Sequence, residues 1–467
     1  MTDSPPTVFW HRRDLRLEDN RGLREAARSG PVVPVLVLDP EIRDTAGAVR
    51  DAFYVASVAA LQRQYRTLGT DLAIQVGAPS EEIPAIVEEV GADRLVYNAD
   101  YSQLANRRDR SVEAALSEQV ETTSVSDLAA HEPGSIRTSA GEHYSVFSYY
   151  YKKWADSDPG TPPAAPEASS FREQASQDVQ EVVGDLGHDL PIPAGRRAAE
   201  KRLERFLDGP IFEYADTRDV PGAEGTSRLS QDLSMGLLGV REVLEGVDAA
   251  AARAGTETEQ DSVEEFRRQV AWRDFYLQVL AAHPETVTED FKEYDNPIAW
   301  RDAPEQFAAW KRGETGYPIV DAGMRQLQAE NYMHNRVRMI VAAFLTKDLQ
   351  IDWREGYRHF REHLLDHDTA NDVGGWQWAA STGTDAQPYF RIFNPMTQGE
   401  RYDPEASYIK AYVPELEGVD PATIHSWPDL DADRREEVAP DYPGPIVDHA
   451  ERRESAIAMF EAARGED

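Results

Sequence analysis

Short β-rich apolar runs alternate with helical patterns over the first 130 residues. The runs cover residues 7–10, 32–38, 72–76, 95–97 and 122–125. Between the second and third runs, residues 51–68 carry apolar side chains at helical spacing. This alternation predicts an α/β domain over residues 1–130 with a parallel, Rossmann-like sheet. No Gly-x-Gly-x-x-Gly sequence follows the first run, so the usual dinucleotide fingerprint is absent.

The pattern changes after about residue 130. Residues 156–195 are rich in Pro, Ala, Ser, Asp and Gly, and residues 158–163 read Asp-Pro-Gly-Thr-Pro-Pro, which cannot continue a helix or a central strand. We therefore predict an interdomain linker over residues 131–197. From residue 198 the patterns are nearly all helical, and one apolar face holds Val337, Ile340, Val341, Phe344 and Leu345. Residues 198–467 are predicted to form an all-α domain.

The chain carries 84 acidic and 49 basic side chains, a formal net charge of −35, and only seven of the basic residues are lysines. A carboxylate-rich, lysine-poor surface is expected of a protein that stays soluble in concentrated salt, so we predict a halophilic source. The total charge by itself argues against a nucleic-acid partner. The absence of cysteine excludes disulfides, zinc-thiolate sites, iron–sulfur clusters and thiol nucleophiles.

The sequence gives no sign of a membrane partner. No apolar run approaches the roughly 20 residues that span a bilayer, and the first residues lack a charged-then-apolar export signal. We expect a cytoplasmic protein.

A segment of small hydroxyl residues around one arginine precedes a helical pattern at residues 224–230, which read Glu-Gly-Thr-Ser-Arg-Leu-Ser. Hydroxyls and backbone N–H groups at the start of a helix can hold a phosphate, and Arg228 adds a charged donor. The alternative is a helix cap without a ligand.

Residues 364–378 form a second unusual tract, Leu-Leu-Asp-His-Asp-Thr-Ala-Asn-Asp-Val-Gly-Gly-Trp-Gln-Trp. The carboxylates of Asp366 and Asp368 could accept hydrogen bonds from hydroxyl and imide groups of a ligand. A metal is the weaker interpretation because no compact set of further ligands accompanies them, and we predict no metal site. The glycine pair lets backbone approach a flat group, and Trp376 and Trp378 offer stacking surfaces, although two core tryptophans are the alternative.

Further motifs complete a recognisable order along the chain. They are Trp-Arg-Asp-Phe-Tyr at 272–276, Gly-Tyr-Pro-Ile-Val-Asp-Ala at 316–322, His-Asn-Arg at 334–336, Phe-Arg-Ile-Phe-Asn-Pro at 390–395, and Trp-His-Arg-Arg-Asp-Leu-Arg-Leu-Glu-Asp-Asn at 10–20. From about residue 7 to about 430, the chain resembles the DNA photolyase and cryptochrome flavoproteins, and the class I cyclobutane-dimer photolyases in particular. The resemblance implies light-driven repair of cyclobutane pyrimidine dimers in UV-damaged DNA, by electron transfer from excited, reduced FAD.

The resemblance also implies which residues hold the cofactor. The positions expected around its phosphates are Tyr214, Thr226, Ser227, Arg228, Leu229 and Ser230. Those expected around its sugar and ring system are Arg273, Asn335, Asp366 and Asp368. Trp376, Trp353 and Trp300 match the tryptophan chain that relays electrons from the surface to the excited flavin. Single buried tryptophans usually belong to the core, but three in the family's positions favour a relay.

A lesion must leave the duplex to reach a buried cofactor. By resemblance, Trp272 and Trp378 form the aromatic walls of its pocket, and Arg218, Asn335 and Arg336 contact its phosphates or bases. Residues 331–400 hold seven basic and nine acidic side chains, so the acidity is lighter there than along the whole chain. This leaves room for a local cationic groove.

A second, antenna chromophore is expected in the N-terminal domain, where a deazaflavin is favoured over a folate. The candidate residues are Arg50 and Asp100, because Asp100 follows a strand at the carboxyl edge of the sheet, where α/β ligands bind. Either side chain could instead be a solvated surface charge. The chain is expected to be a monomer.

Two positions depart from the class I pattern. The glutamate that usually lies three residues before the Trp-Arg motif is here Gln269, which can donate and accept hydrogen bonds but cannot lose a proton. The asparagine beside the reactive flavin nitrogen is here Asp372, as in plant cryptochromes. An ionised Asp372 disfavours an anionic reduced flavin, whereas a protonated one could supply a proton.

These departures keep other functions open. A cryptochrome-like photoreceptor that binds FAD without repair is the main alternative. An acidic electron-transfer flavoprotein without a DNA role is disfavoured by Trp272, Trp378 and Arg336. The pair His334-Asn335 differs from the histidine pair of (6-4) photolyases, so a cyclobutane dimer is the expected lesion.

Overall fold

A computed structural model describes residues 4–184 and 186–465. Two compact units can be distinguished by their internal contacts. The first unit comprises Met1–Glu213, Ser227–Glu285 and Leu365–Ala370, and the second comprises Tyr214–Thr226, Thr286–Leu364 and Asn371–Asp467. Each unit is described by itself.

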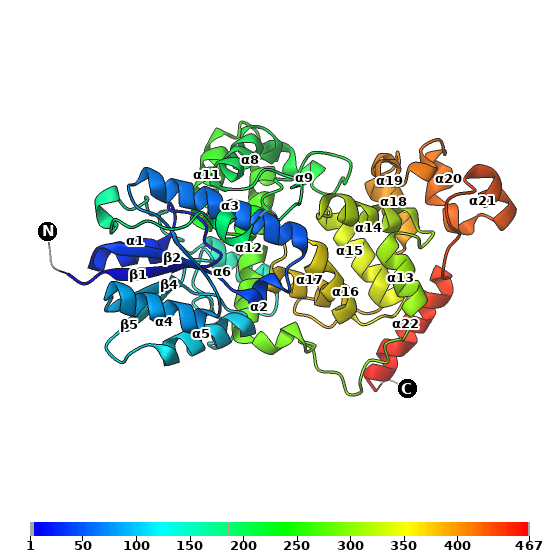
Figure 1. Ribbon diagram of the computed structural model, residues 1–467. Coiled ribbons are helices and arrows are strands. Elements are labelled where there is room, and N and C mark those ends of the chain that lie inside the picture. The colour runs from blue at the N-terminus through cyan, green and yellow to red at the C-terminus, as the bar shows by residue number, and fades with distance from the viewer. Residues whose placement is uncertain (1–3, 185, 466–467) are drawn as a thin grey trace. The chain divides into compact units, whose positions relative to one another are not determined.

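The N-terminal part of the first unit is a five-stranded parallel sheet with the order β3-β2-β1-β4-β5 (Figure 1). Its strands are β1 (Thr7–His11), β2 (Val32–Leu38), β3 (Ala73–Val76), β4 (Arg94–Asn98) and β5 (Glu121–Val125). Each predicted apolar run coincides with one of them, so the predicted fold class is confirmed. The runs could be located because strands covered on both faces are almost continuously apolar.

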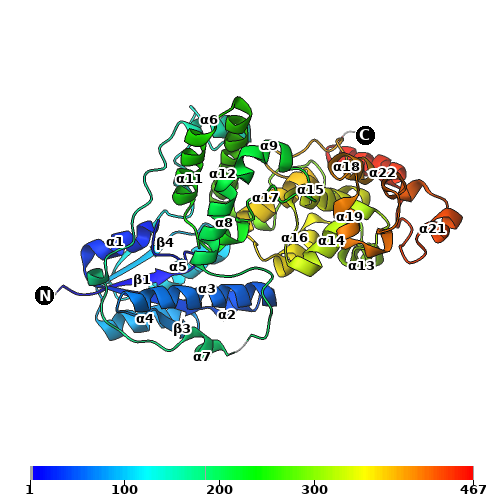
Figure 2. The ribbon, with the colours of Figure 1, turned by 90° about the horizontal axis from the view of Figure 1, so that it is seen from above.

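Helices cover both faces of this sheet, as Figures 1 and 2 show. On one face, α4 (Pro79–Val90) and α5 (Gln103–Ala115) pack against Val8 and Trp10 of β1. On the other face lie α1 (Arg21–Ser29) and α3 (Ala48–Thr67), and His11 Nε2 is 2.6 Å from the Tyr65 hydroxyl of α3. Alternate side chains of β1 therefore pack against the helices on opposite faces of the sheet.

The segment expected to be a linker, residues 131–197, carries helices α6 (Phe147–Ala155) and α7 (Val179–Val183). Phe147, Tyr150, Tyr151 and Trp154 of α6 are buried, and α6 packs against α12 (Glu257–Ala282). The proline-rich composition explains its irregular stretches, but its aromatic residues anchor it to the first unit.

Later parts of the chain are helical, as predicted. The first unit also holds α2 (Pro40–Arg43), α8 (Arg196–Asp208), α10 (Ser230–Ser234) and α11 (Val240–Arg253). The other helices are α9 (Tyr214–Thr217), α13 (Pro304–Arg312), α14 (Pro318–Glu330), α15 (Asn335–Ala343), α16 (Trp353–His363), α17 (Thr369–Ala380), α18 (Pro395–Tyr402), α19 (Ser407–Tyr412), α20 (Pro421–His425), α21 (Ala432–Val438) and α22 (His449–Ala463). Among residues 4–184 and 186–465, no helix is both long and apolar enough to cross a bilayer.

The apolar face predicted for residues 337–345 is buried. Val337, Ile340, Val341, Phe344 and Leu345 belong to one core cluster of the second unit. The helix continues as a π-helical turn at Phe344–Asp348 before α16 begins.

Candidate functional site

A pocket lies at the carboxyl ends of β1 and β4, which are adjacent strands whose chain connections leave in opposite directions across the sheet. This is the switch point at which open α/β sheets bind ligands. Of the two residues predicted for an antenna chromophore, Asp100 lines this pocket, whereas Arg50 is buried in α3 and does not line it. The lining residues include Arg12, Arg13, Asp14, Arg16, Asn98, Ala99, Asp100, Asp127, Leu128 and Arg273.

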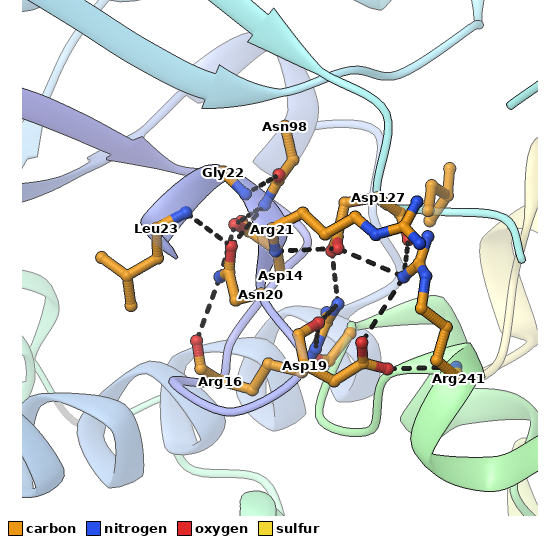
Figure 3. A network of polar contacts seen from close by, with 12 residues as sticks. Asp14, Arg16, Asp19, Asn20, Arg21, Gly22, Leu23, Asn98, Asp127 and Arg241 are labelled. Carbon is orange, nitrogen blue, oxygen red and sulfur yellow. Dashed lines mark hydrogen bonds and ion pairs between the residues drawn. The ribbon is translucent and has the colours of Figure 1, made fainter. Parts of the chain in front are cut away.

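The loop after β1 is held by a buried polar network (Figure 3). Asp14 accepts hydrogen bonds from the side-chain amides of Asn98, at 2.6 Å, and of Asn20, at 3.2 Å. Arg16 forms an ion pair with Asp127, which follows β5. The first motif of the resemblance is therefore fixed to two neighbouring strand ends, and it builds one wall of the pocket.

Arg13 connects this pocket to the Asp366–Asp368 tract. Its guanidinium is ion-paired with Asp368, lies 3.9 Å from Asp100, and donates to the Ser234 carbonyl at 3.1 Å. Burial by itself would lower the pKa of Arg13, but the charges of Asp368 and Asp100 raise it above its usual value. Asp368, predicted to contact the flavin, is buried and is already compensated by the half-buried cation of Arg13, and Asp366 is buried as well.

The Trp-Arg-Asp motif of α12 anchors the chain that follows β5. Arg273 donates to the Leu128 carbonyl at 2.7 Å. One oxygen of Asp274 accepts the Trp154 indole N–H and the Ala130 N–H, each at 2.9 Å. Burial lowers the pKa of Arg273 and raises the pKa of Asp274. Arg273 also lines the pocket, so the motif helps to shape it.

The hydroxyl-rich segment at 226–230 ends where α10 begins, as predicted. The N-cap residue of α10 is Leu229, which has no side-chain capping bond, so the interpretation as a simple capping motif is wrong. Arg228 has a φ of 53° and its carbonyl accepts from the Gln231 side chain at 2.5 Å. Leu229 is buried, Ser230 is exposed, and Thr226, Ser227 and Arg228 are half-buried. Helix-start N–H groups without a side-chain cap suit an anionic ligand.

Two predicted ligand contacts in the second unit lie beside one carboxylate. Arg336 donates to Asp219 at 3.2 and 2.7 Å, and Arg218 lies 3.8 Å from the same residue. The Arg218 guanidinium also lies 5.7 Å from the ring centre of Tyr214, which is buried. Asn335, the first residue of α15, is exposed.

Gln269 and Trp272 lie three residues apart on α12, and therefore on one side of the helix. The Gln269 amide donates to Glu265 at 3.1 Å, one turn earlier. Trp272 stacks on Phe147 with ring centres 3.8 Å apart and an interplanar angle of 10°. Phe147 thus supports one face of the indole predicted to hold the lesion.

The three tryptophans predicted for electron relay, and Trp378 of the two predicted for stacking, belong to the second unit. Trp376 lies edge-on to Phe360 with ring centres 4.9 Å apart. The Trp353 indole donates to Asp290 at 2.8 Å. Trp300 lies edge-on to Phe460, and Trp378 lies 6.3 Å from Phe393. Trp353 and Trp376 are buried, whereas Trp300 and Trp378 are half-buried.

Asp372 is half-buried in the first turn of α17. That it lies beside the reactive flavin nitrogen stays a prediction.

Three features were missed in the sequence. Trp353 and Asp290 are 63 residues apart in the sequence, and Phe147 and Trp272 are 125 apart. A local sequence pattern therefore could not predict either contact. The third, the His-x-x-Glu-His spacing at His359, Glu362 and His363, is visible in the sequence and puts possible metal ligands on one side of α16.

Residues 7–167 match the family model of DNA photolyase, and residues 266–462 match that of the FAD binding domain of DNA photolyase. The chain is 52% identical to the deoxyribodipyrimidine photo-lyase of Halobacterium salinarum, covering 98% of this chain and 100% of that protein. This relative supports the halophilic source predicted from composition.

Two solved structures are also similar over nearly the whole chain. The class III photolyase from Agrobacterium tumefaciens superposes with a TM-score of 0.90 at 33% identity, covering 100% of this chain and 99% of that one. An archaeal photolyase from Sulfolobus tokodaii, solved with two FAD molecules, gives a TM-score of 0.84 at 32% identity, covering 98% and 100%.

Proposed function

Because the chain belongs to the DNA photolyase family, we propose that it repairs UV-damaged DNA by splitting cyclobutane pyrimidine dimers in light. The observation that carries the proposal is the full-length match to the Halobacterium photo-lyase. The tryptophans of the second unit suit electron relay, and the polar segments at 226–230 and 366–368 suit the binding of FAD. That the protein acts as a monomer stays a prediction.

The residues present suit a bound FAD. Hydroxyls and helix-start N–H groups at 226–230, without a capping side chain, fit its phosphates, and the buried carboxylates Asp366 and Asp368 fit its hydroxyl and imide groups. Tyr214, Arg273 and Asn335 complete the set. When bound, FAD supplies light-driven one-electron chemistry, for which protein side chains provide orientation and electrostatics.

The chain's own residues bind and orient the lesion. Trp272, supported from behind by Phe147, presents a rigid stacking surface, and the resemblance assigns Trp378 as a second stacking residue. The Gln269 amide donates an N–H to Glu265, and its oxygen can accept from a pyrimidine N–H. Arg218 and Arg336 contact phosphates, and Asp219 beside them tempers their charge.

Trp376, Trp353 and Trp300 carry electrons inward to restore the reduced cofactor. Indole is among the more easily oxidised side chains, so spaced tryptophans act as stepping stones. Two of the three are buried, which protects them from solvent, and half-buried Trp300 suits the surface end.

A second chromophore binds at the β1–β4 pocket. The likeness to a photolyase solved with two FAD molecules supports a second chromophore in this chain. Asp100 and the arginines of the pocket offer hydrogen bonds to a polar ring system, and a deazaflavin is our preferred identity over a folate.

A photoreceptor without repair activity is the second candidate, because Gln269 and Asp372 both depart from the repair pattern.

The decisive experiment is anaerobic photoreduction of the FAD-loaded protein in molar salt, followed by blue or near-UV illumination with a dimer-containing oligonucleotide. Photolyase activity predicts monomerised thymine in proportion to light dose. Bound, reduced FAD without thymine release would reject repair and select the photoreceptor.

A further inference from the structure

The last two turns of α16 gather three metal-ligating side chains. His359, Glu362 and His363 stand at positions i, i+3 and i+4, so they project from one side of the helix. One nitrogen or carboxylate oxygen from each lies within 4.8 Å of the others. The two imidazole rings are 4.2 Å apart between centres. The proposed repair activity uses none of these residues.

Both imidazoles present an available nitrogen. His363 Nδ1 lies 2.9 Å from the His359 carbonyl oxygen. Because a carbonyl only accepts, Nδ1 carries the proton and the lone pair resides on Nε2. A backbone carbonyl that orients a ring in this way is the usual outer partner of a metal-bound histidine.

His359 supplies the second observation. Its Nε2 atom is buried and has no hydrogen-bond partner among the described residues. A buried polar atom without a partner destabilises a fold, and a bound ion would supply the missing partner. The ring packs edge-on against Trp310, whose ring centre is 5.6 Å away.

We propose that His359, Glu362 and His363 bind a divalent transition-metal ion of the zinc class, with water completing its coordination. Two imidazoles and one carboxylate are a ligand set that Zn²⁺ accepts with one position left open. Exposed Glu362 leaves that position accessible to solvent and contributes the negative charge.

Such an ion would link His359 to Glu362 and His363, one turn further along α16. The same helix begins at Trp353 and receives Trp376 against Gly356, so the ion would stiffen the helix that supports two tryptophans. The proposal does not depend on DNA repair and holds equally for a photoreceptor.

The test is equilibrium dialysis of the FAD-loaded, chelator-treated protein against Zn²⁺ in high salt, with Co²⁺ absorption as a second measurement. We expect one ion per chain and a ligand-field spectrum that includes nitrogen donors. Glu362→Gln, at an exposed position, should weaken binding by at least the roughly 10–100-fold expected for an outer-shell partner. The double variant His359→Phe/His363→Gln should remove the site.

His283→Gln is the matched control, because His283 is an exposed histidine 3.2 Å from a glutamate, Glu285. Its affinity for Zn²⁺ should equal that of the wild type. Three results would each overturn the proposal. They are equal Zn²⁺ binding by the wild type and the double variant, a loss of Zn²⁺ affinity in His283→Gln as large as that in Glu362→Gln, and no Zn²⁺ binding by the wild type. The Glu362→Gln result stands even if the double variant fails to fold.

Discussion

The six-membered ring of Trp376 lies directly against Gly356 of α16, where a Cβ would collide with it. A Cβ on Gly356 would overlap the Cη2 and Cζ3 atoms of that ring and would lie 2.6 Å from Leu345 Cδ2. Gly356 follows Trp353 by three residues on the same helix. Glycine at 356 therefore lets one relay tryptophan approach the helix that carries the next.

Gly356→Ala should push Trp376 away from α16. Overpacking of this kind costs about 1–3 kcal/mol, so the free energy of unfolding should fall by that amount and FAD photoreduction should slow. Denaturant unfolding and the rate of flavin bleaching in light check the two effects. Gly418→Ala, where an added Cβ meets nothing within 4 Å, should change neither. If Gly356→Ala is less stable but FAD photoreduction is unchanged, the contact between Trp376 and α16 supports the fold and does not affect electron relay.

Asp290→Asn should slow photoreduction. Removal of an electron from Trp353 leaves positive charge on its indole, and the Asp290 carboxylate, 2.8 Å from the indole nitrogen, stabilises that charge. Arg354 offsets part of this effect because it lies 2.9 Å from Asp290 and 4.7 Å from the indole centre. We expect a rate lower by about tenfold, corresponding to roughly 1.4 kcal/mol, measured by transient absorption.

Asp352→Asn provides the control for that measurement. Asp352 pairs with the same arginine at 3.0 Å but, unlike Asp290, makes no hydrogen bond to the Trp353 indole. Asparagine also serves well as an N-cap, the position that Asp352 occupies in α16. If both variants slow photoreduction equally, the general charge of the region matters and the specific hydrogen bond does not.

Gln269→Glu should raise the repair yield only when Glu265 is also neutralised. The Gln269 amide donates to Glu265 at 3.1 Å, so a glutamate at 269 would face a carboxylate one helical turn away. Like charges at this spacing destabilise each other and raise a carboxyl pKa. Thymine released per absorbed photon should therefore increase more in Gln269→Glu/Glu265→Gln than in either single variant. A full gain from Gln269→Glu alone would show that Glu265 has no influence.

The sequence predicted the sheet well because its signal is local. Buried parallel strands are continuous apolar runs, and all five were placed correctly between residues 7 and 125. The packed state of residues 131–197 was not predicted, because its cause is aromatic contacts such as Phe147 with Trp272, made by residues far apart in the chain.

Charge compensation at the candidate site was equally hidden. Asp368 was recognised as unusual, yet its ion pair with Arg13 joins residues 355 positions apart. Arg336 was expected to face DNA, and its pairing with Asp219 likewise depends on the tertiary fold. Sequence patterns thus identified the polar residues of the site but not the partners that set their charge.

Glu415→Gln should weaken the second unit at neutral pH and remove part of its acid sensitivity. Arg325 donates to both oxygens of Glu415, at 2.9 and 2.7 Å. Burial by itself would raise the pKa of Glu415, but the hydrogen bonds from Arg325 outweigh it and lower the pKa below its ordinary value.

Because the unfolded chain binds the proton more tightly, the pair stabilises the fold above about pH 4.5, and this stabilisation is lost as the pH falls through the folded-state pKa. We expect a loss of about 1 kcal/mol at pH 7 that shrinks toward zero as the pH falls through the lowered pKa of Glu415, measured by denaturant unfolding at fixed salt. Exposed Glu417, two residues further on, supplies the control. Glu417→Gln should leave the free energy of unfolding unchanged at neutral and at acid pH. A difference between wild type and Glu415→Gln that persists undiminished at low pH would show that shape, rather than charge, accounts for it.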